Sequence, residues 1–259
     1  MHALRVTFLG TGTSQGVPQI ACDCAVCLSP DSRDKRTRSS IYVETPELSW
    51  VVDTGADFRA QCLREGIRRV DAALYTHAHS DHVLGFDDLR PFCQRGRALP
   101  LYGSAVTLEQ MARIFAFAFE PGLRLPGYVH PLPNVVEGEF MLGEVRVLPL
   151  SLPHGRVTST GYLFTRDGEP LLAYLTDCNA VPLEVQRAVA GVRHLVLDAL
   201  RKRPHPTHLS VGEALEVIER VGAGASWLTH LCHDHSHEDL EGELPAGVRV
   251  AYDGLRLEI

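Results

Sequence analysis

One stretch constrains this chain more than any other: Thr76-His77-Ala78-His79-Ser80-Asp81-His82, which reads T-H-x-H-x-D-H. It places three imidazoles and one carboxylate within six residues, directly after an apolar run at residues 71–75 that is typical of a buried strand. Neutral imidazoles and a carboxylate are the usual ligands of zinc, manganese or iron. In a loop between a strand and a helix, alternate side chains can point at one ion and the others at a second. The motif therefore predicts a metal site rather than a polar loop that happens to be rich in histidine.

Length and composition bound the class of protein. The chain has 259 residues, of which 45% are hydrophobic and 22% charged, enough for a large core within one α/β domain. No apolar run approaches the roughly 20 residues that cross a bilayer. The first ten residues lack the basic and apolar regions of a secretion signal and predict a strand instead. We expect a single domain over residues 1–259, located in the cytoplasm, without a membrane partner.

The net charge and the spacing of the cysteines limit the classes of partner and ligand expected for this chain. The formal net charge is −7, whereas proteins that grip long nucleic acids usually show a basic face, because neutralising phosphates supplies most of their affinity. The charge balance therefore argues against a nucleic-acid partner. Three of the seven cysteines lie in Cys22-Asp-Cys24-Ala-Val-Cys27. Without an export signal, this spacing predicts metal thiolates more than disulfides.

The hydrophobic pattern predicts alternating strands and helices. Strands are expected at residues 4–9, 41–43, 50–52, 71–75, 99–102, 140–150, 161–165, 171–175, 194–197 and 226–228, with a closing hairpin at 248–259. Helices are expected at residues 57–65, 84–94, 107–119, 182–190 and 210–221. His77, His154, Asp177 and His230 each follow a predicted strand. Open α/β architectures place their chemistry at the carboxyl ends of strands, so we expect these four residues to meet.

Three further segments carry open interpretations. The run from Gly10 to Pro18 differs from a dinucleotide fingerprint, because its third glycine stands one residue late and no helical pattern follows. We expect a structural loop near the site. Residues 120–133 are rich in proline and glycine and are either a lid or pocket wall, or a plain connection. The apolar stretch at residues 114–119 could pair two subunits, so a homodimer is one expectation.

The order of the metal-type residues resembles the ligand series of the metallo-β-lactamase superfamily, over essentially the whole chain. The resemblance implies an α/β fold, the four-layer αβ/βα sandwich of that superfamily. It also implies two divalent ions, manganese or zinc, with a bridging hydroxide as the nucleophile. One ion would be held by His77, His79 and His154, the other by Asp81, His82 and His230, and Asp177 would bridge them. A β-lactam hydrolase commonly has cysteine in place of Asp177 and lacks a histidine after Asp81, so that specialism is disfavoured.

The start of the chain indicates one branch of this superfamily. The run from Gly10 to Pro18, followed by C-x-C-x2-C, resembles the phosphoribosyl cyclic phosphate phosphodiesterases of phosphonate breakdown. That family places a structural zinc on the three thiolates and on a histidine just after the last catalytic one. The resemblance therefore implies one closed zinc site, at Cys22, Cys24, Cys27 and His233. Competing fourth ligands are Cys232, His235 and His237. A cofactor-biosynthesis relative shares this cluster, but its catalytic motif is degenerate.

The resemblance also implies catalytic residues outside the ligand set. His208 stands where the family carries a histidine that binds the phosphate and protonates the leaving oxygen. His205 is the alternative, and a solvated loop histidine is the plainer interpretation. Asp81 is a candidate catalytic residue as well as a ligand. Asp53 would orient a ligand histidine from behind, and Asp198 would do so less clearly.

These features predict a dinuclear metal-dependent phosphodiesterase that hydrolyses a small phosphate diester, cyclic and built on ribose or a nucleotide. One alternative is an RNA-processing nuclease similar to the tRNA 3′-end endonuclease. That activity needs a basic arm, and residues 120–133 hold only Arg124 as a fixed cation. A non-catalytic, zinc-stabilised binding protein of the same fold is the third possibility, disfavoured because seven ligands beside His208 exceed what a scaffold needs.

Overall fold

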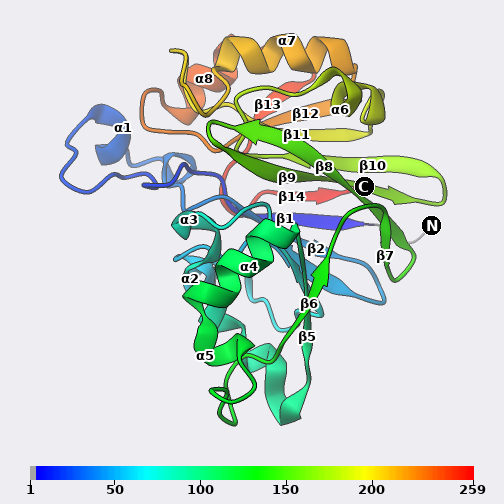
Figure 1. Ribbon diagram of the computed structural model, residues 1–259. Helices are drawn as coiled ribbons and strands as arrows, with labels where there is room; N and C mark the ends of the chain where they lie inside the picture. The colour runs from blue at the N-terminus through cyan, green and yellow to red at the C-terminus, as the bar shows by residue number, and fades with distance from the viewer. Residues whose placement is uncertain (1–3) are drawn as a thin grey trace.

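The polypeptide folds into two facing sheets with helices on both outer sides (Figure 1). The computed structural model describes residues 4–259, apart from the side chains of residues 94–96. Within these residues each sheet has seven strands. The first has the order β14-β1-β2-β3-β4-β5-β6, with bounds Arg256–Glu258, Arg5–Gly10, Ser40–Glu44, Ser49–Val52, Ala72–Leu74, Leu99–Gly103 and Pro131–Val135. The second has the order β13-β12-β11-β10-β9-β8-β7, with bounds Val248–Val250, Ala225–Thr229, His194–Asp198, Glu169–Leu175, Val157–Arg166, Val145–His154 and Phe140–Leu142.

Helices cover the outer face of each sheet (Figure 1). Over the first sheet lie α2, α4, α5 and the 3-10 segment η2, with bounds Phe58–Glu65, Ala105–Ile114, Ala116–Phe119 and Phe86–Gly96. Over the second lie α6, α7 and α8, with bounds Leu183–Ala188, Val211–Val221 and His237–Glu243. The short elements α1, η1 and α3 belong to loops, with bounds Ala25–Leu28, Ser32–Asp34 and Ser80–Val83. The four-layer αβ/βα sandwich predicted from the sequence is therefore confirmed.

Alternate residues of the central strands pack into different layers of the core. In β3, Trp50 and Val52 face the core between the sheets, whereas Val51 faces the outer helices. In β10, Tyr174 faces the inner core and Ala173 the outer one. Strands buried on both faces appear in the sequence as nearly continuous apolar runs, which is why these strands could be predicted. This core fixes the strand ends from which the candidate site is built.

Several predicted elements take a different form. The predicted closing hairpin is wrong, because β13 pairs with β12 in the second sheet and β14 with β1 in the first. Residues 140–150 are not one strand, since a turn at Gly143, with φ of 58°, separates β7 from β8. The predicted helix at 84–94 is the 3-10 segment η2, which contains Pro91, a residue without the N–H that an α-helix needs.

The predicted helix at residues 107–119 breaks at Phe115, where φ is −113° and ψ is 37°. Phe115 and Ala118 are buried in the outer core, and within residues 114–119 only Ile114 is exposed. The expected apolar surface patch is therefore wrong in its extent, because most of it faces the protein's own interior. None of the helices within residues 4–259 combines the length and the apolar character that crossing a bilayer requires.

Candidate metal centre

The carboxyl ends of four strands meet at one edge of the sandwich. His77 follows β4, His154 ends β8, Asp177 follows β10 and His230 follows β12. Asp177 and His230 have positive φ angles of 54° and 60°, which non-glycine residues rarely adopt. Such strained backbone is concentrated at functional sites, where the surrounding structure holds it in place. The predicted convergence of these four residues is therefore observed.

Two groups of metal-type side chains lie side by side at this edge. The first is His77, His79 and His154, and the second is Asp81, His82, Asp177 and His230. Within each group the candidate ligand atoms all lie within 4.8 Å of one another. Oδ2 of Asp177 lies 3.3 Å from Nε2 of both His82 and His230, and 3.9 and 3.8 Å from Nε2 of His77 and His154. Asp177 thus stands between the groups, and all seven predicted ligands are brought together.

The buried donor atoms of this cluster fit metal ions. Nε2 of His82 and both ring nitrogens of His230 are buried and have no hydrogen-bond partner of suitable geometry among residues 4–259. Buried polar atoms are otherwise nearly always paired, so each unpaired one needs an explanation. Imidazole nitrogens that converge on shared carboxylate oxygens are the donor set of borderline divalent metals. The residues present therefore suit zinc or manganese.

The electrostatics of the cluster point the same way. Burial alone would lower the pKa of His82, but Asp177 and Asp81 hold it well above its usual value. Burial also opposes protonation of His230, yet the nearby carboxylates of Asp177 and Asp81 raise its pKa to about 9. Burial would raise the pKa of Asp177, but His230 and His82 lower it well below its usual value. The buried carboxylates require positive charge, which a divalent cation supplies in place of protons.

Groups behind the cluster hold the imidazoles in place. Oδ2 of Asp53 lies 2.7 Å from Nδ1 of His82 and accepts a 2.8 Å hydrogen bond from the Thr76 hydroxyl. The carbonyl oxygen of Thr207 lies 2.7 Å from Nδ1 of His154. Fixing one ring nitrogen in this way leaves the other to face the cluster. The sequence indicated Asp53, but it gave no sign of Thr207, because the contact is made by a backbone carbonyl.

His208 lies beside the cluster with its own carboxylate. Its Nδ1 is 2.7 Å from Oδ2 of Asp198, and its ring stacks on His230 at 4.5 Å between centroids. The ring of His205 is 5.3 Å away, and Nδ1 of His205 faces the Thr207 hydroxyl at 3.1 Å. Burial and the neighbouring His208 lower the pKa of His205. Of the two candidate histidines, His208 is the one oriented by a carboxylate.

The cluster opens into a cavity of about 600 Å³. Ligand residues form its floor, and its walls are residues 155–157 after β8, residues 205–208 and Ser14. The run from Gly10 to Pro18 therefore borders the site through Ser14, as expected of a nearby loop. Residues 120–133 contribute none of the described lining residues, so they form no wall of this cavity, which agrees with the interpretation as a plain connection. Arg156 was not predicted from the sequence, although it lies two residues after the predicted ligand His154.

Close packing joins two of the cavity walls. Gly155 has a φ of 63°, and a Cβ atom there would come within 2.6 Å of Cγ2 of Thr207. Its backbone N–H also donates to Oδ1 of Asn179 at 3.3 Å. Glycine is therefore required both by the backbone angle and by the neighbouring side chain. This contact fixes the turn after His154 against the segment that carries His208.

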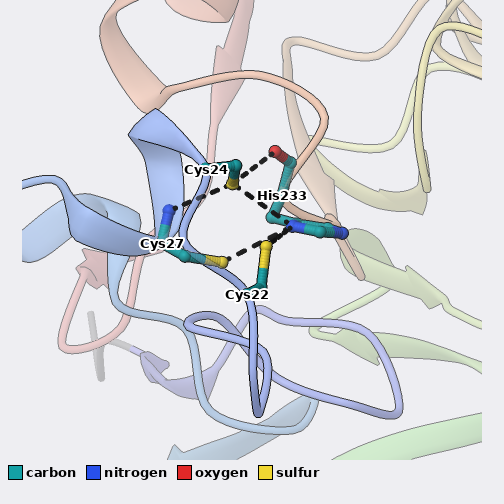
Figure 2. Close-up of side chains that lie close together, drawn as sticks. All are labelled: Cys22, Cys24, Cys27 and His233. Atoms are coloured by element: carbon teal, nitrogen blue, oxygen red, sulfur yellow. Dashed lines mark hydrogen bonds between the residues drawn. The ribbon is translucent and has the colours of Figure 1, made fainter.

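A second cluster joins the start of the chain to its last third (Figure 2). Nδ1 of His233 lies 3.2 Å from Sγ of Cys22 and 3.4 Å from Sγ of both Cys24 and Cys27. Three thiols around one imidazole nitrogen form a closed set of four donors, the composition of a structural zinc site. A hydrogen bond from the backbone of Cys27 is the main cause that lowers the pKa of Cys24 to about 6.

The competing fourth ligands lie outside this cluster of four. Nδ1 of His237 is 3.3 Å from a guanidinium nitrogen of Arg36. His235 is buried, and its ring nitrogens have no hydrogen-bond partner among residues 4–259. Cys232 is half-buried, and burial raises the pKa of its thiol to about 11. The predicted choice of His233 therefore agrees with the geometry.

With this geometry in place, the comparisons with known proteins identify the family. The family model described as a beta-lactamase superfamily domain matches residues 50–231, the span that holds every residue of the seven-ligand cluster. The chain belongs to the metallo-β-lactamase superfamily. A crystal structure described as a new diphosphatase from the PhnP family superposes with a TM-score of 0.92 at 38% identity, covering 100% of this chain and 98% of that one.

Two curated relatives of this superfamily member differ in name. An octanoyltransferase from Porphyromonas gingivalis is 36% identical over 97% of this chain, but the chain spans only 51% of that protein. Coenzyme PQQ synthesis protein B from Methylobacterium radiotolerans is 30% identical, over 99% of this chain and 100% of that protein. Proteins similar to this chain thus carry different names, and the reaction of this chain has to be argued from its site.

Proposed function

We propose that this protein is a metal-dependent phosphodiesterase that hydrolyses a small phosphate diester, such as a cyclic phosphate of ribose or of a nucleotide. The position of Asp177 carries the proposal. Its Oδ2 atom lies between 3.3 and 3.9 Å from a ring nitrogen in each of four histidines. One carboxylate between two groups of ligands is the arrangement expected for a pair of metal ions that act on one phosphate.

In this proposal, His77, His79 and His154 hold one ion, Asp81, His82 and His230 hold the other, and Asp177 contacts both. When bound, a pair of manganese or zinc ions polarises phosphate oxygens and makes water nucleophilic at neutral pH. A third ion, a structural zinc, belongs to Cys22, Cys24, Cys27 and His233. Its role is to tie the N-terminal loop to the segment just after His230, and so to stabilise one side of the catalytic cavity.

The proton needed by the leaving oxygen comes from His208. Asp198 faces its Nδ1 at 2.7 Å, so Nε2 is the nitrogen left for the cavity, which His208 lines. A histidine held in this way can give a proton to the alkoxide as the bond breaks. Asp81 also lines the cavity and stays a candidate for a direct catalytic role besides ligation.

The walls of the cavity favour a small substrate over a polymer. A volume of about 600 Å³ suits a sugar phosphate or a mononucleotide, since small-molecule sites typically measure about 300–1,000 Å³. Arg156 is the only lysine or arginine among the described lining residues. A nuclease would need a row of such cations to hold the RNA backbone, so the small diester is preferred.

The names of two similar proteins, the octanoyltransferase and the PhnP-family diphosphatase, suggest other substrates. An octanoyl chain needs an apolar channel, yet the described lining is made mostly of histidine, aspartate and small polar residues. Octanoyl transfer is therefore not proposed for this chain. A diphosphate, the substrate type in the name of the PhnP-family structure, offers the same phosphate oxygens as a diester. The diphosphate is the competing substrate that the experiment must separate.

The test compares turnover of three substrate types by protein loaded with manganese or with zinc. These are ribose and nucleoside cyclic phosphates, bis(p-nitrophenyl) phosphate, and a dinucleoside diphosphate. We expect a cyclic phosphate to be opened with the highest kcat/KM. Preference for the diphosphate would replace the diester in this proposal. Absence of turnover on all three, with both ions bound, would refute it.

A further inference from the structure

A groove on the outer surface, apart from the catalytic cavity, has no role in the proposed reaction. It lies between α2 and η2 and has a volume of about 370 Å³. Its apolar surface includes the buried Phe58, the half-buried Cys62 and Phe92, and Leu63, whose relative exposure is 65%. None of its lining residues is shared with the catalytic cavity. The groove is therefore a separate hollow with an aromatic and aliphatic surface.

Two arginines at this groove form no ion pair with a described residue. Arg59 and Arg68 line it and are exposed, and neither forms an ion pair or a side-chain hydrogen bond with any residue the structure describes. Asp88, half-buried, is the acidic residue of the lining, and the positive charge of Arg59 acts on it. The groove therefore has an excess of one positive charge, in a chain whose net charge is −7.

The arginines of an adjoining hollow give the contrast. That hollow, of about 280 Å³, shares Arg68 with the groove, and its other arginines are Arg5, Arg69 and Arg256. All three are paired with acidic residues at distances of 3.5, 2.6 and 3.2 Å respectively. Paired arginines are already neutralised, so the unpaired charge of the two hollows comes from Arg59, which lines only the groove, and from Arg68, which lies at the border between them.

The groove is also held in shape by backbone contacts near the metal centre. Thr54, which precedes α2, donates its N–H to the carbonyl of His82 at 2.8 Å, and Gly85, which precedes η2, donates to the carbonyl of Thr54 at 2.8 Å. A Cβ atom at Gly85 would meet the carbonyl oxygen of Gly55. The two walls are thus locked together at one end, and preformed hollows are the kind that bind small ligands.

We propose that this groove binds a small organic anion that has a flat apolar body, such as an aryl carboxylate, sulfonate or phosphate. The apolar body lies against Phe58, Phe92 and Leu63, and the anionic group pairs with Arg59 and Arg68. The charge complementarity selects an anion over a neutral compound of the same shape. The site is distinct from the catalytic cavity, so its ligand is neither the substrate nor a competitor of the substrate.

The test measures binding of naphthalene-2-sulfonate and of the uncharged naphthalene-2-methanol to the metal-loaded protein, by calorimetry and by NMR. Saturating inorganic phosphate is included to occupy the catalytic cavity. We expect the sulfonate to bind more tightly than the alcohol, without displacement by phosphate. The double variant Arg59→Gln with Arg68→Gln should weaken sulfonate binding by about fivefold, the effect of losing a partly exposed ion pair. Arg113→Gln, which removes one positive charge from the exposed surface of α4, is the control, and each single variant, Arg59→Gln and Arg68→Gln, is compared with it.

Each remaining outcome overturns the proposal. Displacement of the sulfonate by phosphate would assign it to the catalytic cavity. Equal affinity for the sulfonate and the alcohol, or equal weakening by Arg113→Gln, would remove the role of Arg59 and Arg68. Lack of binding up to millimolar concentration would remove the site. Because the readout is binding, these results are independent of whether the proposed phosphodiesterase activity is found.

Discussion

Oδ2 of Asp198 lies 2.7 Å from Nδ1 of His208, at the carboxyl end of β11. The same oxygen accepts a 2.8 Å hydrogen bond from the backbone N–H of Cys178, so the carboxylate is itself held on a strand end. The ring of His208 lies against that of His230, with an angle of 17° between their planes. Asp198 therefore fixes both the position and the orientation of a histidine beside the candidate metal ligands.

The first prediction concerns this pair. His208→Ala should lower kcat for a cyclic phosphate by about 10²- to 10⁴-fold, the usual contribution of a general acid, while the metal content stays unchanged. Asp198→Asn should give a smaller loss, because the imidazole stays but loses its fixed orientation. Steady-state kinetics with metal analysis of the same samples measure both. The control is His205→Ala. A larger loss of kcat in His205→Ala than in His208→Ala would mean that His205, and not His208, donates the proton.

The second prediction concerns Asp177. Asp177→Ala should release both catalytic ions and abolish turnover, because this carboxylate lies within 3.9 Å of histidines from both groups. The thiolate site, formed by Cys22, Cys24, Cys27 and His233, should keep its zinc. The metal count should therefore fall from three ions per chain to one. Elemental analysis and circular dichroism measure the count and the fold. Asp87→Ala, on the surface in η2, should change neither, and retention of three ions by Asp177→Ala would refute the bridging role.

The third prediction concerns the thiolate site. Cys27→Ser should remove one zinc and lower the Tm by at least about 5 °C, because a structural zinc contributes its binding energy to folding. The residues that it joins, Cys22 and His233, are 211 positions apart in the chain. Cys62→Ala removes a thiol from the surface groove and should leave the zinc count unchanged. If Cys27→Ser keeps a full complement of zinc, another residue such as Cys232 must complete the site.

The candidate site could be predicted from the sequence because its ligands lie in one short motif and at the ends of recognisable strands. The motif from Thr76 to His82 supplies four ligands in one loop, and each remaining ligand stands at the carboxyl end of a strand that the hydrophobic pattern predicts. A strand of that kind has few alternative positions in an α/β fold, so its carboxyl end can be placed with the others. The cavity walls were harder to predict, because no sequence motif marks Arg156, Ser14 or the backbone carbonyl of Thr207.

The last part of the chain shows why sheet membership could not be predicted. Residues 248–259 have two apolar segments around Asp253-Gly254, which is the pattern of a hairpin. In the structure the Asp253 carboxylate instead accepts hydrogen bonds from the backbone N–H groups of Thr11 and Thr37, at 2.9 and 2.8 Å. These long-range bonds direct β14 to the first sheet while β13 stays in the second. Three-residue strands contain too little pattern to distinguish the two arrangements.

The fourth prediction concerns the acid stability of the first sheet. Asp71, just before β4, accepts a backbone hydrogen bond from Ser49 at 2.9 Å and pairs with Arg69 and Arg97. Burial opposes its ionisation, but Arg97 and Ser49 lower its pKa below 3.8. The folded protein therefore binds fewer protons than the unfolded chain, so the stabilisation is complete above pH 3.8 and is lost as the pH falls through the folded pKa.

Asp71→Asn should accordingly cost about 1 kcal/mol at pH 7, the value for an ion pair partly open to solvent, and less at pH 3. Urea unfolding of metal-stripped protein at both pH values measures this difference, because metal release at low pH then affects neither sample. Asp87→Asn serves as the matched control for a surface carboxylate and should show a smaller cost at pH 7. A cost for Asp71→Asn that is the same at pH 7 and pH 3 would mean that the carboxylate acts by packing and hydrogen bonding, and that its charge contributes nothing to the stability of this sheet.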